Sequence, residues 1–396
     1  MDMIMDKRKN VYIWTAFMAI FILALYLFNT NLQYTPPGDI ETGIVYSKAV
    51  VTKVLSDDMG PDPDVPGIRI GKQQLELKIL SGPQKGKITQ AKNFVGRLNN
   101  IHAVKGTKLI VTSYDDFVTT AVINYSREDK LLILLLVFLS IVVFFGRIKG
   151  LKAIFSLAFT LVCVIFLFIP LVISGVNPVL AAIIISVLST AVTLLSLNGW
   201  GTKTITAGIS CIGCMLLAGG LSYGAGLVTR ITTLNTHEAQ DLLFVSQRTS
   251  LKIRDLLFAG IIIASLGAIM DTTMSIASAI AEIKELNPSL TEKQLFKSGM
   301  NVGRDVMGTM TNTLILAFTG SSINVLIMLF MYKLPFIQLI NMDMLVIEVI
   351  HGLSGCIAVI LSIPITSYLA SKVFTKTKPE TELRPAIQTE EPEPAL

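Results

Sequence analysis

Residues 256–280, LLFAGIIIASLGAIMDTTMSIASAI, decide the fold class of this chain. A transmembrane helix needs about 20 predominantly apolar residues, and this stretch exceeds that length with a single charged side chain, Asp271. Seven further stretches have the same character: residues 11–28, 131–145, 153–173, 179–197, 204–228, 308–332 and 345–370. The sequence therefore predicts an α-helical polytopic membrane protein with about eight spans.

The composition of the whole chain supports the same fold class. Its 396 residues are 52% hydrophobic and only 15% charged, whereas a soluble domain carries roughly 25% charged residues. This deficit excludes an ordinary soluble enzyme and a disordered chain, and the uninterrupted apolar blocks argue against an outer-membrane barrel with alternating strands. The net charge of +5 is too small for this length to indicate nucleic-acid binding.

Lysine and arginine in the short loops predict the orientation, because such loops are richer in basic residues on the cytoplasmic side. With the amino terminus inside, fourteen basic residues fall in inner segments and five in short outer loops. The count predicts a multi-pass cell-membrane protein with both termini cytoplasmic and residues 29–130 extracytoplasmic. One alternative stays open: residues 204–228 form a re-entrant pair, which would reverse every later segment.

Four regions follow from this reading. Residues 1–28 are a cytoplasmic start and membrane anchor helix, and residues 29–130 are a polar outer domain. Residues 131–375 form a seven-span membrane domain. Residues 376–396, which are rich in Pro and Glu, predict a disordered cytoplasmic tail.

The outer domain has the sequence pattern of a small β-barrel. Apolar and polar residues alternate along residues 43–55, 74–80, 108–112 and 117–125, as in half-buried strands. Four or five short strands in this length predict an OB-like or SH3-like barrel. Few aromatic residues and nearly balanced charges argue against nucleic acid as a ligand. We therefore expect an interaction or gating module that contacts a protein partner.

Polar side chains inside the predicted spans mark the candidate functional site. A charged side chain at the centre of a span costs about 2.5–3.5 kcal/mol on insertion scales, so Asp271, Glu348 and His351 require an explanation. Together with Asn312 they predict a polar transport path that binds or relays a proton, a cation or a small solute. In the alternative interpretation, Glu348 and His351 only reach headgroup water, and Asp271 pairs with Arg304 near the inner boundary.

Other chemistries have weaker support. The sequence Glu348-x-x-His351 resembles half of a di-metal carboxylate motif, but no second E-x-x-H occurs in the chain, so we expect neither a metal nor another cofactor. No nucleophile elbow, Walker loop or H-E-x-x-H motif is present, and we expect no enzyme. Cys211 and Cys214 form a C-x-x-C pair that suits a thiol relay, although the small residues around them favour helix packing.

Two blocks, LGAIMDTTMSIASAI at residues 266–280 and SGMNVGRDVMGTMTNTLILAFTG at residues 298–320, resemble the YibE/F family of bacterial membrane proteins. The order of anchor, outer β domain and helical bundle agrees with this resemblance. The resemblance implies that Asp271, Arg304, Asp305 and Asn312 belong to one characteristic motif and act together, with Arg304 and Asp305 at the inner entry. It supplies no reaction and no catalytic residues.

Three functions remain after this reading. The leading hypothesis is a transporter or permease that moves an ion or small solute through the bilayer along a path near Asp271. The second is a non-transporting scaffold or sensor that binds a partner through its outer β domain. The third is a transmembrane thiol-redox carrier that uses Cys211 and Cys214.

Overall fold

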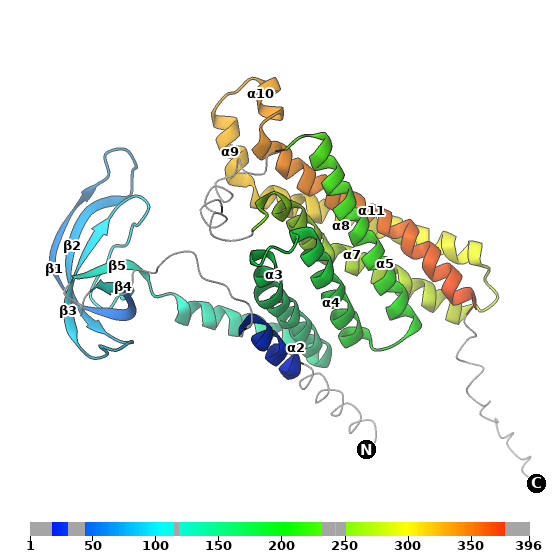
Figure 1. Cartoon of the computed structure of the whole chain (residues 1–396), viewed down its shortest axis with the longest axis horizontal. Coiled ribbons are helices and arrows are strands. Elements are labelled where there is room, and N and C mark those ends of the chain that lie inside the picture. The colour runs from blue at the N-terminus through cyan, green and yellow to red at the C-terminus, as the bar shows by residue number, and fades with distance from the viewer. Residues whose placement is uncertain (1–17, 31–43, 115–118, 232–241, 243–250, 377–396) are drawn as a thin grey trace, which may run out of the picture. The chain divides into compact units, whose positions relative to one another are not determined.

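The computed structural model describes residues 18–30, 44–114, 119–231, 242 and 251–376 (Figure 1). The chain divides into two compact units, residues 36–145 and residues 1–35 together with 146–396. Three predicted segments lie largely outside the described residues: the start of the first span, the predicted outer loop after residue 228, and the tail beyond Lys376.

The first of these units contains a closed five-stranded barrel, as the alternating pattern predicts. Its strands are β1 (Val45–Pro61), β2 (Arg69–Ile79), β3 (Ile88–Val95), β4 (Lys108–Tyr114) and β5 (Thr119–Tyr125). They pair in the order β1-β2-β3-β5-β4, and β1 closes the barrel against β4. All pairs are antiparallel except β3 with β5.

Strand β3 is the strand that the sequence pattern does not reveal. Its inward positions include Ala91 and Asn93, and its outward positions include Ile88 and Phe94. A polar residue inside and two large apolar residues outside obscure the alternation that identifies a half-buried strand. Asn93 is nevertheless well placed, since its Nδ2 donates to Gln73 Oε1 (3.0 Å) and to the Ile101 carbonyl (2.7 Å).

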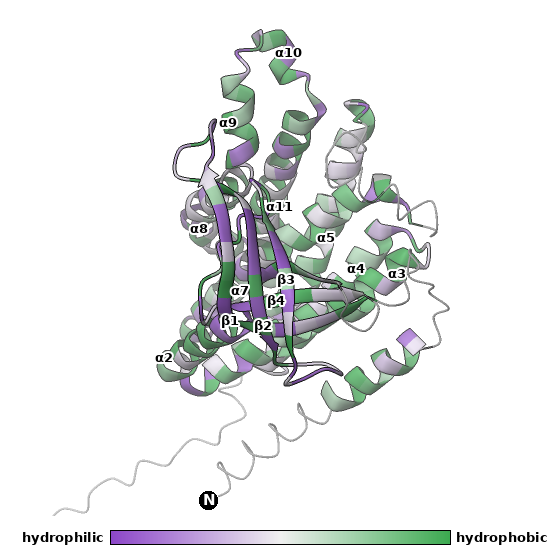
Figure 2. Cartoon of the chain, turned by 90° about the vertical axis from the view of Figure 1, so that its left-hand side faces the viewer, coloured by the Kyte–Doolittle hydropathy of each residue, from purple (hydrophilic) through white to green (hydrophobic). Residues whose placement is uncertain are grey.

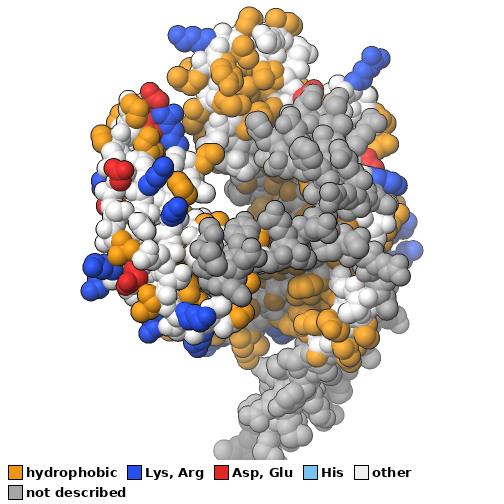
Figure 3. Space-filling view, turned by 60° about the vertical axis from the view of Figure 1, so that its left-hand side comes forward, with side chains coloured by type: hydrophobic (Ala, Val, Ile, Leu, Met, Phe, Trp, Pro, Cys, Tyr) orange, Lys and Arg blue, Asp and Glu red, His pale blue; other side chains and the backbone are white. Residues whose placement is uncertain are grey.

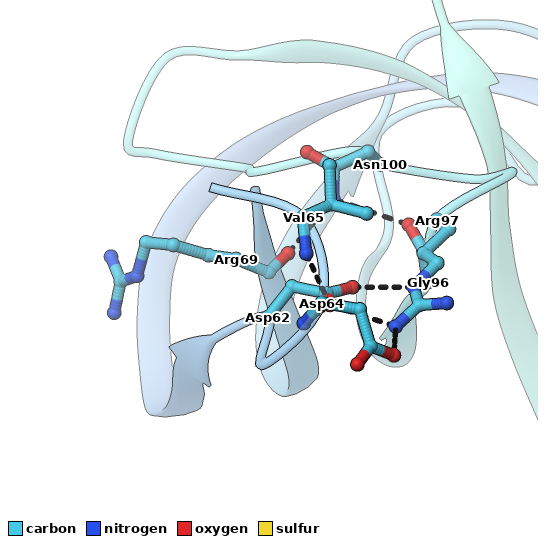
Figure 4. A network of polar contacts seen from close by, with 7 residues as sticks. All are labelled: Asp62, Asp64, Val65, Arg69, Gly96, Arg97 and Asn100. Atoms are coloured by element: carbon cyan, nitrogen blue, oxygen red, sulfur yellow. Dashed lines mark hydrogen bonds and ion pairs between the residues drawn. The ribbon is translucent and has the colours of Figure 1, made fainter. Parts of the chain in front are cut away.

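A network of polar contacts joins two loops at the edge of the barrel (Figure 4). The Asp62 carboxylate is inaccessible to solvent and accepts from Arg97 Nε (2.6 Å) and Nη2 (2.8 Å). It also accepts from the backbone N–H groups of Asp64 (2.8 Å) and Val65 (3.1 Å). The guanidinium of Arg97 also pairs with the Asp64 carboxylate. Arg97 therefore holds the loop between β1 and β2 in place.

The barrel is also tied to the first residues of α2 (Glu128–Cys163) within the same unit. Lys48 of β1 pairs with Glu128 (2.7 Å), and Lys108 of β4 pairs with Asp129 (2.6 Å). The Asp129 carboxylate raises the pKa of Lys108. Since these side chains are exposed, each pair contributes little free energy by itself.

The second unit is helical. After α2 come η2 (Val164–Phe168), α3 (Ile169–Ile173), α4 (Pro178–Asn198), α5 (Thr202–Val228), α7 (Ile253–Leu286), α8 (Glu292–Ser321), α9 (Ile323–Met331), α10 (Phe336–Ile340) and α11 (Asp343–Lys376). A capping box between Thr291 and Gln294 begins α8. Helix α5 runs unbroken for 27 residues, so its glycines do not split it into a re-entrant pair.

Five helices of the described residues are long and apolar enough to cross a membrane, or six if α8 and α9 count as one span bent by 61°. A shorter apolar helix occupies Met18–Thr30. The helical membrane class is therefore supported, whereas the predicted number of about eight spans is not confirmed. One reason is that α2, η2 and α3 run together over 46 residues, with a non-helical backbone at Arg147 (φ 47°, ψ −127°).

The helices of the bundle approach closely at glycines. A Cβ atom on Gly226 of α5 would meet Phe258 at 2.4 Å, and one on Gly303 of α8 would meet Ile363 of α11 at 2.1 Å. Small residues allow such contacts between membrane helices. Helix α11 lies at the centre of this packing, in contact with α5, α7 and α8.

The outer surface of the helices is mostly apolar. The helices in Figure 2 are coloured largely as hydrophobic, whereas the strands carry long hydrophilic stretches. None of the side chains in the most apolar part of α2 is buried, as expected for a helix that faces lipid. On the face drawn in Figure 3, charged side chains of both signs lie among hydrophobic ones.

Candidate functional site

Between Gly260 and Glu282, helix α7 has an exposed face without any large apolar side chain, which we name the α7 stripe. It consists of Gly260, Ala264, Gly267, Asp271, Ser275 and Glu282. The opposite face buries Ile262, Ile269 and Ile276 completely. By contrast, the exposed face of α5 presents large apolar residues such as Ile209 and Leu216, as lipid contact requires. The α7 stripe is therefore suited to water or protein and poorly suited to acyl chains.

The length of the α7 stripe matches the thickness of a membrane. With a rise of 1.5 Å per residue, Gly260 and Glu282 lie about 33 Å apart, and the hydrocarbon core is about 30 Å thick. Asp271 falls midway along this face. Its carboxylate is exposed in the single chain, so the sequence prediction of a carboxylate inside a span leads to a side chain that looks outward from the bundle.

Helix α8 has a second polar surface, which we name the α8 polar face. Its exposed members are Asn301, Arg304, Asp305, Gly308 and Asn312. Arg304 Nη1 donates to Asn301 Oδ1 at 3.4 Å. Among the described residues, no ion pair or hydrogen bond joins Asp271 to Arg304 or Asn312, so the alternative pairing of Asp271 with Arg304 is absent from this structure.

Glu348 and His351 are brought together on α11, as their spacing predicts. Their side chains are 29% and 22% exposed, and His351 Nδ1 lies 4.0 Å from Glu348 Oε2. The imidazole stacks on Phe318 of α8, with ring centroids 5.7 Å apart. His351 Nε2 also lies 4.0 Å from the point where a Cβ on Gly260 would be. His351 therefore stands where α7, α8 and α11 meet, beside one end of the α7 stripe.

A cavity of about 250 Å³, open to the molecular surface, lies beside this junction, between α11 and the bend that joins α8 to α9. Its polar lining comes from Glu348, Thr319 and Ser322, and its walls are otherwise apolar. Breaks in spanning helices are tolerated where they line a cavity or are buried in protein. Sequence reasoning missed this cavity, because the bend at Ser322 has neither a proline nor a charged residue to signal it.

The bundle interior holds many buried hydroxyl groups that the sequence analysis did not single out. They lie on α4, α5, α7 and α11 and include Ser186, Ser189, Thr190, Ser210, Ser265, Thr272, Thr273, Ser362, Thr366, Ser367 and Ser371. Some donate to their own helix, as Ser210 does to the Thr206 carbonyl (2.8 Å). Others, such as Ser186 and Ser265, have no hydrogen-bond partner in the described part of the chain. Their recurrence at three- and four-residue spacing is the signal that could have revealed them.

All four cysteines are buried and free of disulfides. Thr190 Oγ1 and Cys211 Sγ lie 3.8 Å apart, and Cys356 Sγ donates to the Thr311 carbonyl at 3.7 Å. Buried thiols in apolar surroundings are inert, whereas reactive ones need partial exposure. This geometry supports helix packing as the role of Cys211 and Cys214.

The site residues give no support to metal binding. Within the described ranges, no group of three or more His, Cys, Asp or Glu side chains is arranged to hold a metal ion. Asp271, the one further ligand that the sequence suggested for the Glu348–His351 pair, lies eleven residues along α7 from Gly260, or about 16 Å.

Comparison with known proteins agrees with the resemblance seen in the sequence. The family model described as YibE/F-like protein matches residues 134–376, which is more than half of the chain and contains both polar faces and the cavity. No curated protein and no solved structure matches. The matched region begins inside α2 and leaves out the barrel. The chain belongs to the YibE/F-like protein family.

Proposed function

We propose that this protein is a transporter or permease that moves an ion or small solute along the α7 stripe, past Asp271. The observation that carries the proposal is the stripe itself. A spanning helix with a membrane-length face of Gly, Ala, Ser, Asp and Glu residues is a poor surface for lipid but a good wall for a polar path. Ionisable residues within spans commonly mark such paths.

Two further groups extend the proposed path. His351 stands beside Gly260 at one end of the α7 stripe, Glu348 lies next to His351, and we assign this pair to the outer mouth. Arg304, Asp305 and Asn312 place charge and an amide on α8, and we assign Arg304 and Asp305 to the inner entry.

We also propose eight crossings, with both termini cytoplasmic and the barrel outside the cell membrane. The 46 residues of α2, η2 and α3 would extend about 69 Å, enough for two crossings of a core about 30 Å thick. The non-helical backbone at Arg147, followed by Lys149 and Lys152, suits a cytoplasmic turn. Together with Met18–Thr30 and the bent α8–α9 pair, this division yields the eight spans.

Flux in proteoliposomes tests the transport proposal. Vesicles that hold the purified protein are given a proton, Na⁺ or K⁺ gradient in turn, followed by gradients of small organic solutes; an enclosed dye selective for the ion, or a radiolabel on the solute, reports its entry. We expect flux above that of empty vesicles for at least one of these, and Asp271→Asn should reduce it about tenfold or more because the charge in the span is removed.

Glu292→Gln supplies the matched control for this assay. Glu292 is an exposed carboxylate in the first turn of α8, outside both polar faces, so its substitution should leave flux unchanged. The transport proposal fails if no gradient is dissipated, or if Asp271→Asn carries the same flux as the native protein.

A scaffold or sensor is the second candidate function, and one observation favours it. The Lys48–Glu128 and Lys108–Asp129 ion pairs connect the barrel to the start of α2. A partner that binds the barrel would therefore act next to a membrane helix. Deletion of residues 31–126 should abolish capture of such a partner and leave the bundle folded. If transport persists after the deletion, the barrel is not part of the path.

A further inference from the structure

The cavity beside the α8–α9 bend has an unusual balance of charge. Glu348 is the charged side chain in its lining, and Thr319 and Ser322 add hydroxyl groups. The remaining walls are apolar, with Phe318 and Leu326 on the side of the bend and Val349 on α11. A carboxylate between apolar walls is costly unless a cation or hydrogen-bond donors compensate it.

Compensation from the protein is weak. Among the described residues, Glu348 has one ion-pair partner, His351, at the limiting distance of 4.0 Å. That imidazole lies in a stack with Phe318 and sits beside Gly260 of α7. No lysine or arginine of the described chain lies within ion-pair distance of Glu348. The Glu348 carboxylate, which is 29% exposed, is therefore available to pair with a cation on its cavity side.

The volume of the cavity indicates the size of the cation that can pair with Glu348. A cavity of about 150 Å³ holds one benzene molecule. The cavity here, at about 250 Å³, has room for one ring and a short chain that ends in a charged group. We propose that this cavity is a binding site for a small organic cation, a protonated amine whose ammonium pairs with Glu348 and whose apolar body lies against Phe318, Leu326 and Val349.

This binding site does not depend on the proposed function. A molecule bound there could be a substrate at the outer end of the α7 stripe, a regulator or an inhibitor. An equilibrium binding measurement reports on the site alone. Binding without flux would leave this inference intact and count only against transport.

The experiment uses the full-length protein in detergent micelles and calorimetric titration with 2-phenylethylammonium. Its uncharged analogue, 2-phenylethanol, has the same ring and chain length. We expect saturable binding of the ammonium. The alcohol should bind at least about tenfold more weakly, since a charge-assisted hydrogen bond is lost. Glu348→Gln should weaken ammonium binding by a similar factor and leave the alcohol unaffected.

Two further variants protect the test against misfolding. Val349→Phe keeps the carboxylate but fills the cavity from α11, and it should abolish binding of both compounds. Glu292→Gln, a carboxylate outside the cavity, should bind as the native protein does. The proposal is overturned if the native protein binds no ammonium, as it would if lipid filled the cavity. It is equally overturned if the alcohol binds as tightly, or if Glu348→Gln and Val349→Phe leave binding intact.

Discussion

At the scale of single residues, Asp62 shows how the β-barrel depends on one buried carboxylate. Arg97, the main cause, together with the backbone N–H groups of Asp64 and Val65, lowers the pKa of Asp62 from 3.8 to about 2. The same contact raises the pKa of Arg97. A carboxyl group whose pKa is lowered by folding stabilises the fold when it is charged.

This shift predicts how the stability of the barrel responds to acid. The Asp62 contribution should be complete above about pH 4 and should disappear as the pH falls through about 2, where the folded carboxylate is protonated. Asp62→Asn should lower the thermal unfolding temperature of the barrel by several degrees at neutral pH. The difference from the native protein should shrink towards zero as the pH approaches 2.

Asp58→Asn is the control, because Asp58 is an exposed carboxylate on β1, the strand that leads into the loop of Asp62. Circular dichroism melts at several pH values measure the effect. A constant difference between the native protein and Asp62→Asn at every pH would contradict the ionic origin of this stabilisation.

At the scale of elements, contact between α8 and α11 depends on glycines that the sequence shows without revealing their partners. Gly303 and Gly308 belong to one helix, yet a Cβ on Gly303 would meet Ile363 at 2.1 Å and one on Gly308 would meet nothing within 4 Å. The two positions face opposite sides of α8, one towards α11 and the other on the α8 polar face.

The pair supplies a matched test of helix packing. Gly303→Ala should destabilise the bundle by about 1–3 kcal/mol, because an added methyl group forces two packed helices apart. Gly308→Ala should be neutral or slightly stabilising, since alanine favours a helix more than glycine does. Thermal unfolding in detergent measures both effects, and equal unfolding temperatures would show that α8 and α11 are not in close contact.

At the scale of the whole molecule, the proposed eight crossings make a prediction about sidedness. Asp58 in the barrel, Lys149 after the break in α2 and Ser174 after α3 are all exposed. Cysteines placed at these positions should report outside, inside and outside, respectively. Two crossings between Asp58 and Ser174 require this alternation.

Labelling with a membrane-impermeant maleimide in intact and permeabilised cells gives the readout. The four native cysteines are buried, so the unsubstituted protein should remain unlabelled and serve as the control. If Asp58→Cys and Ser174→Cys react on opposite sides, α2, η2 and α3 cross the membrane once and the eight-span proposal is wrong.

The sequence by itself determined the membrane class, the barrel, the pairing of Glu348 with His351 and the family. These features depend on composition and on local spacing: apolar blocks of membrane length, alternation along strands, and the three-residue separation that places Glu348 and His351 on one helical face. The sequence pattern did not reveal strand β3 because Asn93 faces in and Phe94 faces out.

Only the tertiary structure decided which face of each helix is exposed, because a face becomes buried only when neighbouring helices pack against it. Packing of α7 against α4, α5, α8 and α11 leaves Asp271 on an open stripe, and the bend after Ser321 creates the cavity at Glu348.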